Sequence, residues 1–217
     1  MIRPNRVILI FGPTAVGKTD LLVRLFSDRG EVISADSMQV YRYMDVGTAK
    51  PGPEVLDRLP HYLIDIKNPD EQYNAGEFVQ SADRLVPEIE SRGRVPVVSG
   101  GTAFYFRNFI YGLPESPPGD EAVRERLREE LETEGSEPLF RELERVDPVT
   151  AGRIKPTDTY RILRALEVFR VSGSPLSGFT VRKEPRDLYR FLVLGLRRPR
   201  EELETEGSEP LFRELER

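Results

Sequence analysis

The sequence has no cysteine, no tryptophan and a single histidine, His61, among its 217 residues. Without cysteine, disulfides and Cys-ligated zinc sites are excluded. A Ser-His-Asp triad would have to use His61, which begins an apolar segment with no nucleophile motif nearby, so we interpret His61 as structural. No apolar run is long enough to span a membrane and no apolar leader opens the chain. We therefore expect a cytoplasmic protein with no membrane partner.

Charge is distributed unevenly along the chain, whose formal net charge is -5. Residues 121–147 are strongly acidic, whereas residues 148–200 contain 12 basic and 4 acidic side chains. Two interpretations of the basic stretch remain open. It is either a solvated helix face or the contact surface for a polyanion.

A glycine-rich motif follows the apolar residues 7–11. It reads Gly12-Pro13-Thr14-Ala15-Val16-Gly17-Lys18-Thr19, which is G-x-x-x-x-G-K-T between a strand and a helix. Glycines let successive backbone N–H groups converge on an anion, the lysine adds positive charge, and the threonine hydroxyl can ligate Mg²⁺. The alternative is a strand-to-helix turn without a ligand. The motif predicts a site for a phosphate-bearing ligand.

Strands alternate with helices in the first half of the chain. We expect strands at residues 7–11, 31–35, 61–65 and 95–99, and helices at residues 18–28, 75–92 and from Thr102 onward. Gly30 is expected to end the first helix, and residues 37–60 to form an irregular connection. The alternation predicts an α/β fold, a P-loop NTPase-like parallel sheet core with ligands beyond the carboxyl ends of its strands.

The pattern changes after Gly112, where a proline-rich linker leads into a mostly helical segment. Helices are expected at residues 120–133, 137–145 and 157–172, and a strand at residues 190–196 that rejoins the sheet. The expected organisation is a core of residues 1–112, a helical insertion of residues 113–187, a return to the core over residues 188–199, and a terminal segment of residues 200–217.

An 18-residue stretch occurs twice, because residues 128–145 are identical to residues 200–217. Repeat architectures need several diverged copies at a fixed period, which these are not. We interpret the second copy as an anomaly, either an artefact or the result of a recent recombination at a short identical segment. It would then replace the native C-terminal part of the fold.

Asp36 is the carboxylate of greatest chemical interest, because it ends the second expected strand on the same edge of the sheet as the glycine-rich loop. A carboxylate there can serve a magnesium-bound water or accept a proton from a nucleophile attacking beside the phosphate. The alternative is a helix cap or a surface residue. Thr102, in Gly100-Gly101-Thr102, lies at the end of a neighbouring strand.

Several short sequence motifs of this chain occur together in one known family. They are the glycine-rich motif, Ser34-Ala35-Asp36-Ser37-Met38-Gln39-Val40-Tyr41, Met44-Asp45-Val46-Gly47-Thr48-Ala49-Lys50-Pro51, Gly100-Gly101-Thr102, and Tyr160-Arg161-Ile162-Leu163-Arg164-Ala165-Leu166-Glu167-Val168. From residue 7 to residue 199 the chain closely resembles the tRNA dimethylallyltransferases (tRNA isopentenyltransferases). The family continues past Arg197-Arg198-Pro199, where this chain has the repeated segment instead.

The resemblance implies transfer of a dimethylallyl group from its diphosphate to N6 of the adenosine 3′ of the anticodon. It implies that residues 12–19 bind dimethylallyl diphosphate, that Thr19 assists through Mg²⁺, and that Asp36 is the general base. The tRNA-binding residues it implies are Asp36, Ser37, Met38, Gln39, Thr102, Arg124, Tyr160, Arg161, Ile162, Leu163 and Arg164. We expect a monomer.

Three other functions stay open from the residues. One is a P-loop small-molecule kinase, which would bind ATP at the loop. Another is a prenyltransferase of free adenine nucleotides, which has no need of a basic helical insertion. The third is a truncated, inactive protein that binds phosphate or RNA.

Overall fold

The computed structural model describes residues 5–179 and 182–199. The chain forms two compact units. We call Met1–Gly112 with Glu184–Arg217 the sheet unit, and Leu113–Lys183 the helical unit. The terminal repeat of residues 200–217 lies outside the described residues.

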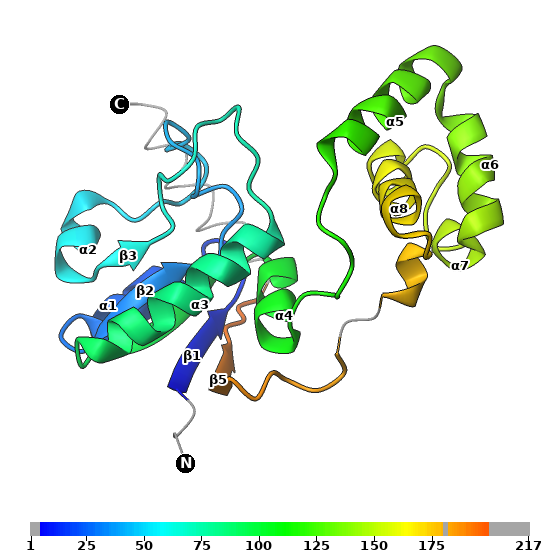
Figure 1. The fold of residues 1–217 in the computed structure, drawn as a ribbon. Helices are drawn as coiled ribbons and strands as arrows, with labels where there is room; N and C mark the ends of the chain where they lie inside the picture. The colour runs from blue at the N-terminus through cyan, green and yellow to red at the C-terminus, as the bar shows by residue number, and fades with distance from the viewer. Residues whose placement is uncertain (1–4, 180–181, 200–217) are drawn as a thin grey trace. The chain divides into compact units, whose positions relative to one another are not determined.

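The sheet unit contains five parallel strands in the order β3-β2-β4-β1-β5 (Figure 1). The strands are β1 (Asn5–Phe11), β2 (Gly30–Ser34), β3 (His61–Tyr62), β4 (Val95–Gly100) and β5 (Tyr189–Gly195). The helices of this unit are α1 (Lys18–Phe26), α2 (Pro53–Arg58), α3 (Ala75–Ser91) and α4 (Ala103–Tyr111). The predicted α/β class with a parallel sheet is confirmed.

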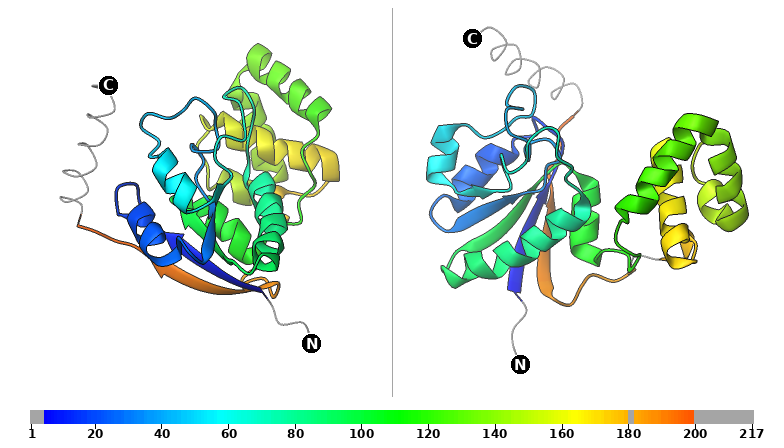
Figure 2. Two further views of the ribbon diagram at one scale, coloured as in Figure 1. Left: turned by 90° about the vertical axis from the view of Figure 1, so that its left-hand side faces the viewer. Right: turned by 45° about the horizontal axis from the view of Figure 1, so that its top comes forward.

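Helices cover both faces of the sheet, because alternate strand residues point in opposite directions. Val7 and Leu9 of β1 are buried in one apolar cluster with Phe78 of α3. Ile10 belongs to a second cluster, with Leu22 of α1. The left view of Figure 2 shows the sheet between α1 on one side and α3 and α4 on the other.

Three local expectations were wrong. Gly30 begins β2 and does not end a helix, since α1 already ends at Phe26. The third strand stops at Tyr62, because Leu63 and Asp65 have φ of 66° and 53°, outside the extended region. Residues 37–60, expected to be irregular, contain α2, which begins with Pro53 in the first helical position.

The expected return strand does pair with the sheet. β5 runs parallel to β1, from Asn5 opposite Tyr189 to Phe11 opposite Gly195. Arg186 ties the approach to this strand to the sheet unit, with its guanidinium donating to both carboxylate oxygens of Asp83 (2.8 and 2.9 Å) and to the Phe109 carbonyl (2.9 Å). The helical unit therefore ends at Lys183, earlier than residue 187.

The helical unit consists of α5 (Glu121–Glu134), α6 (Ser136–Val146), α7 (Pro148–Ala151), α8 (Thr159–Ser172) and the short 3₁₀ helix η1 (Leu176–Gly178). It has an apolar core of its own, in which Leu127, Leu143 and Leu166 are fully buried. The first copy of the repeat spans part of α5 and most of α6. No helix among the described residues is long and apolar enough to cross a membrane.

Three strand ends meet at Gly100, where the backbones approach closely. A Cβ on Gly100 would lie 2.1 Å from the Ala35 carbonyl oxygen. The Ala35 N–H donates to the Ser99 carbonyl (2.7 Å) and the Gly12 N–H donates to the Gly100 carbonyl (3.3 Å). Only glycine permits this approach, which brings the ends of β1, β2 and β4 together.

We predict that Gly100→Ala lowers the free energy of unfolding by about 3 kcal/mol, because the added methyl overlaps backbone atoms that cannot move aside singly. Urea unfolding measures the change. Gly195→Ala on β5 is the matched control, since a Cβ there meets nothing within 4 Å, and we expect it to cost under about 0.5 kcal/mol. Equal costs for the two variants would contradict the close approach.

Candidate functional site

The glycine-rich loop joins β1 to α1 in the geometry that its sequence requires. Gly17 has φ of 91° and Ala15 has φ of 65°, both in the left-handed region. Pro13 and Thr14 are exposed, whereas Val16 is buried and anchors the loop. Val16 can therefore offer a ligand only its backbone, as can the two glycines of the motif.

Lys18 lies across the loop. Its Nζ donates to the carbonyls of Gly12 (2.8 Å) and Pro13 (2.7 Å). Burial lowers the pKa of Lys18, and the negative charge of Asp36 acts in the opposite direction. Lys18 and Asp36, from different strand ends, therefore interact electrostatically.

Asp36 follows β2, and its two carboxylate oxygens have different surroundings. Oδ1 accepts from the backbone N–H groups of Met38 (2.9 Å) and Gln39 (3.2 Å), which holds the turn. No hydrogen bond to Oδ2 occurs among the described residues. The side chain is thus oriented by one oxygen while the other stays available to accept a proton.

A pocket of about 290 Å³ brings the loop and Asp36 together. Its lining includes most of the loop together with residues of β2 and β4 and of the following segments, namely Thr14, Ala15, Gly17, Lys18, Thr19, Asp20, Leu22, Val32, Ser34, Asp36, Gln39, Thr48, Ala49, Pro51, His61, Ser99 and Gly100. One cavity is therefore lined by the glycine-rich loop, a lysine, a threonine hydroxyl and a carboxylate.

Thr102 stands beside the residue after Asp36. Its Oγ1 accepts from the Ser37 backbone N–H (3.0 Å) and lies 3.4 Å from the Ser37 Oγ. The Thr102 N–H donates to the Ala35 carbonyl (3.2 Å). Ser37 and Thr102, both candidate tRNA contacts, are thus adjacent, and the exposed Met38 lies next to them in sequence.

Gln39 and Lys50 hold the segment that closes one side of the pocket. The Gln39 amide donates to the carbonyls of Thr48 (3.1 Å) and Ala49 (2.9 Å) and accepts from Ser34 Oγ (3.0 Å). The Lys50 side chain is only 8% exposed, and its Nζ donates to the Tyr41 carbonyl and to the carboxylates of Asp45 and Asp65. Neither structural role was expected from the sequence, in which Gln39 was expected only as a tRNA contact.

His61 also lines the pocket. Its Nδ1 lies 2.7 Å from the Leu59 carbonyl oxygen, which can only accept, so Nδ1 carries the proton. Burial lowers the pKa of His61, against the opposing effect of that hydrogen bond. His61 is consequently neutral near pH 7, with Nε2 unprotonated.

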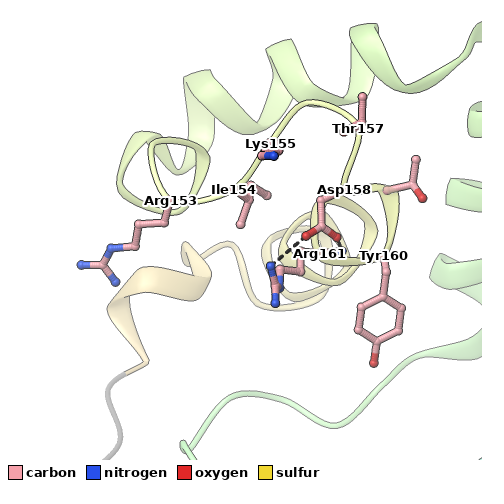
Figure 3. Close-up of a pocket in the computed structure, with 8 residues that line it drawn as sticks. Arg153, Ile154, Lys155, Thr157, Asp158, Tyr160 and Arg161 are labelled. Atoms are coloured by element: carbon pink, nitrogen blue, oxygen red, sulfur yellow. Dashed lines mark hydrogen bonds and ion pairs between the residues drawn. The ribbon is translucent and has the colours of Figure 1, made fainter.

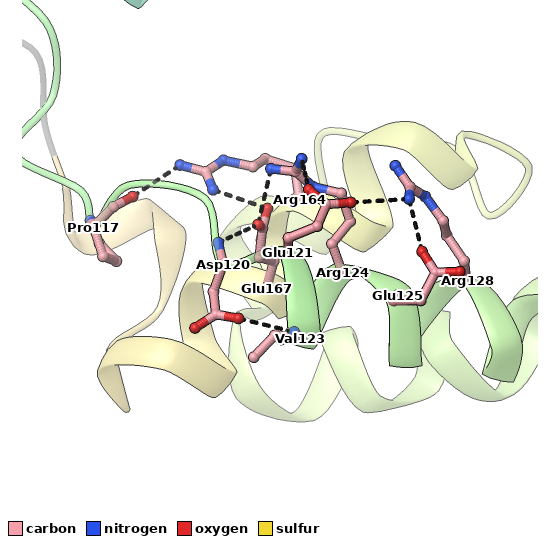
Figure 4. Close-up of polar contacts among 9 residues, drawn as sticks. All are labelled: Pro117, Asp120, Glu121, Val123, Arg124, Glu125, Arg128, Arg164 and Glu167. Atoms are coloured by element: carbon pink, nitrogen blue, oxygen red, sulfur yellow. Dashed lines mark hydrogen bonds and ion pairs between the residues drawn. The ribbon is translucent and has the colours of Figure 1, made fainter.

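In the helical unit, two of the candidate tRNA contacts are engaged with a buried carboxylate (Figure 4). Glu167 is 3% exposed at its side chain and accepts from Arg124 Nη2 (3.0 Å) and Arg164 Nη1 (2.9 Å). It also accepts from the Asp120 backbone N–H (2.9 Å). Arg164 donates further to the Pro117 carbonyl. Arg124 and Arg164 therefore bind the linker and α5 to α8.

The remaining candidates in this unit differ in exposure. Tyr160 is 82% exposed, and the Arg161 side chain is largely exposed and pairs with Asp158. Ile162 is 1% exposed and Leu163 is partly buried, both in the apolar core. The Ile162 side chain packs inside the apolar core and has almost no exposed surface to offer a tRNA.

Comparisons with known proteins find one family consistently. The sequence model of the IPP transferase family matches residues 39–207. The chain is 49% identical over 201 residues to tRNA dimethylallyltransferase 2 of Geotalea uraniireducens, covering 91% of this chain and 64% of that protein. It is 46% identical to the tRNA dimethylallyltransferase of Geobacter sulfurreducens. The chain spans less than two thirds of the length of these relatives.

Solved structures agree. The tRNA isopentenylpyrophosphate transferase of Bacillus halodurans matches with a TM-score of 0.60 at 36% identity, over 98% of this chain and 66% of that one. A eukaryotic dimethylallyltransferase acting on tRNA matches with a TM-score of 0.75 at 28% identity, over 96% of this chain and 53% of that one.

We predict that Glu167→Gln destabilises the helical unit by about 2–3 kcal/mol, because the partly buried Arg164 loses its counter-charge and Arg124 keeps only the exposed Glu121. Hydrogen exchange of the α5 and α8 amides measures the loss. Glu137→Gln is the control, since Glu137 pairs with Arg141 on the exposed surface, and such pairs contribute at most about 0.5 kcal/mol. Similar protection in both variants would contradict a structural role for Arg124 and Arg164.

His61 predicts a pH effect on stability. Because its pKa is lower in the folded state, the unfolded chain binds the proton more readily, so stability falls as the pH drops below about 6.5. His61→Gln should remove up to about 1.4 kcal/mol of the loss between pH 7.5 and 5.5, measured by urea unfolding. Glu31 and Asp147, whose pKa values are also lowered, titrate below this window. Unchanged pH dependence in the variant would contradict a neutral, partly buried His61.

Proposed function

Because this chain belongs to the IPP transferase family, we propose that it transfers a dimethylallyl group from dimethylallyl diphosphate to N6 of the adenosine 3′ of the anticodon in tRNA. The observation that carries the proposal is the single pocket that joins the phosphate loop to Asp36. A leaving diphosphate and the proton acceptor for an incoming amine need to be neighbours, and this pocket supplies both groups.

The loop binds the diphosphate. The backbone N–H groups of residues 14–17 and the Lys18 ammonium stabilise the negative charge that grows on the diphosphate as its bond to the allylic carbon breaks. Lys18 exchanges its two loop carbonyls for phosphate oxygens in this step. No hydrolysis of ATP is required.

Asp36 accepts the proton. As the N6 lone pair forms a bond to C1 of the dimethylallyl group, the C1–O bond breaks and its electron pair leaves with the diphosphate. The proton of N6 passes to Oδ2 of Asp36, while Oδ1 keeps the carboxylate oriented through Met38 and Gln39. The adenine leaves its stack to reach the pocket, where Ser37, Met38, Gln39 and Thr102 line the approach.

The donor set fits Mg²⁺. Thr19 supplies a hard hydroxyl oxygen in the pocket, and the described residues contain no group of three or more His, Asp or Glu side chains that would make an all-protein cage. Magnesium usually takes few protein ligands together with substrate phosphates and water. Thr19 would hold the ion, which supplies charge neutralisation of the diphosphate when bound.

The test is incubation of the full chain with labelled dimethylallyl diphosphate, Mg²⁺ and unmodified tRNA, with ATP hydrolysis measured in parallel. Label transferred to tRNA is the expected result. Nucleotide turnover without transfer would favour a kinase and overturn the proposal, and tRNA binding without transfer by the folded chain would leave only a binding protein.

We predict that Asp36→Asn lowers the rate of transfer by about 10²–10⁴-fold, because the amide keeps an oxygen for the Met38 and Gln39 N–H groups but cannot accept a proton. Affinity for tRNA should change little. Asp70→Asn, at an exposed position outside the pocket, makes the same chemical change as a control and should retain the rate. A comparable rate in Asp36→Asn would remove Asp36 from the catalytic role.

A further inference from the structure

The concave surface of the helical unit belongs to the function already proposed. It has a volume of about 520 Å³ and lies between α7 and the start of α8 (Figure 3). Its lining includes Tyr160 and Arg161, which the family resemblance assigns to tRNA, together with Arg153, Ile154, Lys155, Thr157, Asp158 and Thr159. A second cationic pocket lies in the sheet unit, and neither the resemblance nor the proposed function accounts for it.

The pocket of the sheet unit is formed at the ends of α1 and α2 and has a volume of about 590 Å³. We call it the arginine pocket. Its lining residues are Val23, Arg24, Leu25, Ser27, Asp28, Arg29 and Arg58. None of them lines the pocket that joins the phosphate loop to Asp36. The volume lies within the range of small-molecule sites, about 300–1,000 Å³.

The parallel pairing of β2 with β3 explains why the lining residues meet. Arg29 directly precedes β2, and Arg58 comes shortly before β3. The Val32 N–H of β2 donates to the Pro60 carbonyl (2.8 Å), which joins the two approaches. Residues that precede two paired parallel strands share the amino edge of the sheet. The arginine pocket therefore lies at the edge opposite to the phosphate loop and Asp36, which follow their strands.

Two of the three guanidinium groups have no partner in the described part of the chain. The side chains of Arg24 and Arg58 are exposed and make neither a hydrogen bond nor an ion pair with residues 5–179 or 182–199. Arg29 is oriented by its Nε, which donates to the Leu25 carbonyl (2.8 Å), and by the Phe26 ring, whose centroid lies 5.8 Å away. Its Nη groups meet no acceptor among the same residues. The pocket therefore offers the N–H donors of three guanidinium groups to a ligand.

The negative groups around the pocket do not cancel this charge. The Val23 carbonyl accepts from Ser27 Oγ, and the Asp28 carbonyl accepts from Arg94, so these carbonyls at the end of α1 are already hydrogen-bonded. Among the described residues that line the pocket, Asp28 is the one acidic side chain. One carboxylate against three guanidinium groups leaves a net charge of +2.

We propose that the arginine pocket binds a small molecule that carries two or more linked phosphate groups. A guanidinium presents its N–H donors as a planar fork. Forks that come from two helices need an acceptor with oxygens in several directions, which a tetrahedral phosphate has and a planar carboxylate lacks. The net charge of +2 favours a ligand with more than one negative charge. Leu25, which is 40% exposed, provides an apolar wall for the organic part of the ligand.

Helix dipoles explain positive charge at these positions, but not the choice of arginine. Arg24 and Arg58 occupy the last turns of α1 and α2, where a cation interacts favourably with the carbonyl end of the helix. A lysine would serve a dipole equally well, because only its charge is needed. The fork of donors matters to a bound phosphate, so replacement by lysine separates the two roles.

The test is calorimetric titration of the full chain with inorganic tripolyphosphate in the absence of Mg²⁺. Arg24→Ala/Arg58→Ala should weaken binding at the arginine pocket by about 10-fold or more. Titration of the Lys18→Ala chain, whose phosphate loop is impaired, should still detect the arginine pocket. The matched control is Arg84→Ala/Arg107→Ala, which removes the same charge from exposed positions of α3 and α4 outside the pocket. The control should bind tripolyphosphate like the original chain.

A second variant, Arg24→Lys/Arg58→Lys, keeps the charge at both helix ends and removes the forks. It should keep the midpoint of thermal unfolding and weaken tripolyphosphate binding by about 5-fold. Unchanged binding together with a lowered midpoint would assign the two arginines to the helices alone and overturn the inference.

The remaining outcomes separate other ligands and the proposed function. Tripolyphosphate binding that is equal in the Arg24/Arg58 alanine variant and its control would overturn the inference. Arginine-dependent binding of phosphatidic acid vesicles or of polyglutamate, without binding of tripolyphosphate, would assign the surface to a membrane or an acidic protein and also overturn it. In the transfer assay without tripolyphosphate, the alanine variant should keep kcat and both KM values, because the two pockets share no lining residue. Failure of transfer in the original chain would contradict the proposed function and leave this inference standing.

Discussion

The contact between Gly100 and Ala35 is the constraint on which the sheet unit's site depends. A side chain at residue 100 would overlap the Ala35 carbonyl oxygen, so the ends of β2 and β4 can meet only because this residue has none. The Gly12 N–H then bonds the Gly100 carbonyl, which attaches the phosphate loop to the same point. Lys18, Asp36 and Thr102 come from three separate parts of the chain, and this junction is what makes them neighbours.

The helical unit depends on a different interaction, the hydrogen bonds and ion pairs that the buried carboxylate of Glu167 makes with neighbouring segments. Glu167 receives the Asp120 N–H and two guanidinium groups, so it joins α5, the preceding linker and α8. Of the three arginines that the family resemblance singles out, Arg124 and Arg164 are held by this carboxylate, whereas Arg161 pairs with Asp158 at the start of α8.

The roles of Gln39, Lys50 and His61 in the site depend on non-local contacts, which a sequence pattern does not record. Of the three, only Gln39 was expected in the site, as a tRNA contact. Gln39 and Lys50 both lie in motifs that carry the family resemblance. In the structure, Gln39 connects residues 48 and 49 to β2, and Lys50 bonds to Tyr41 and Asp65. Leu63 and Asp65 end the third strand because their φ values are positive, which the pattern of apolar residues in the sequence does not predict. His61 was correctly expected to begin a strand, but its place in the pocket wall follows from the pairing of β3 with β2.

The sequence by itself determined the glycine-rich loop, the alternation of strands and helices, and Asp36 as the carboxylate after a strand end, because local spacing encodes each of them. The resemblance of several short motifs identified the family. Only the tertiary structure decided which charges are available. Ile162 and Arg164 are two residues apart on one helix, yet one is core and the other binds a buried glutamate, while Arg153 and Lys155 meet no carboxylate among the described residues. Whether a cation meets a carboxylate is set by the packing of distant helices, which no local pattern records.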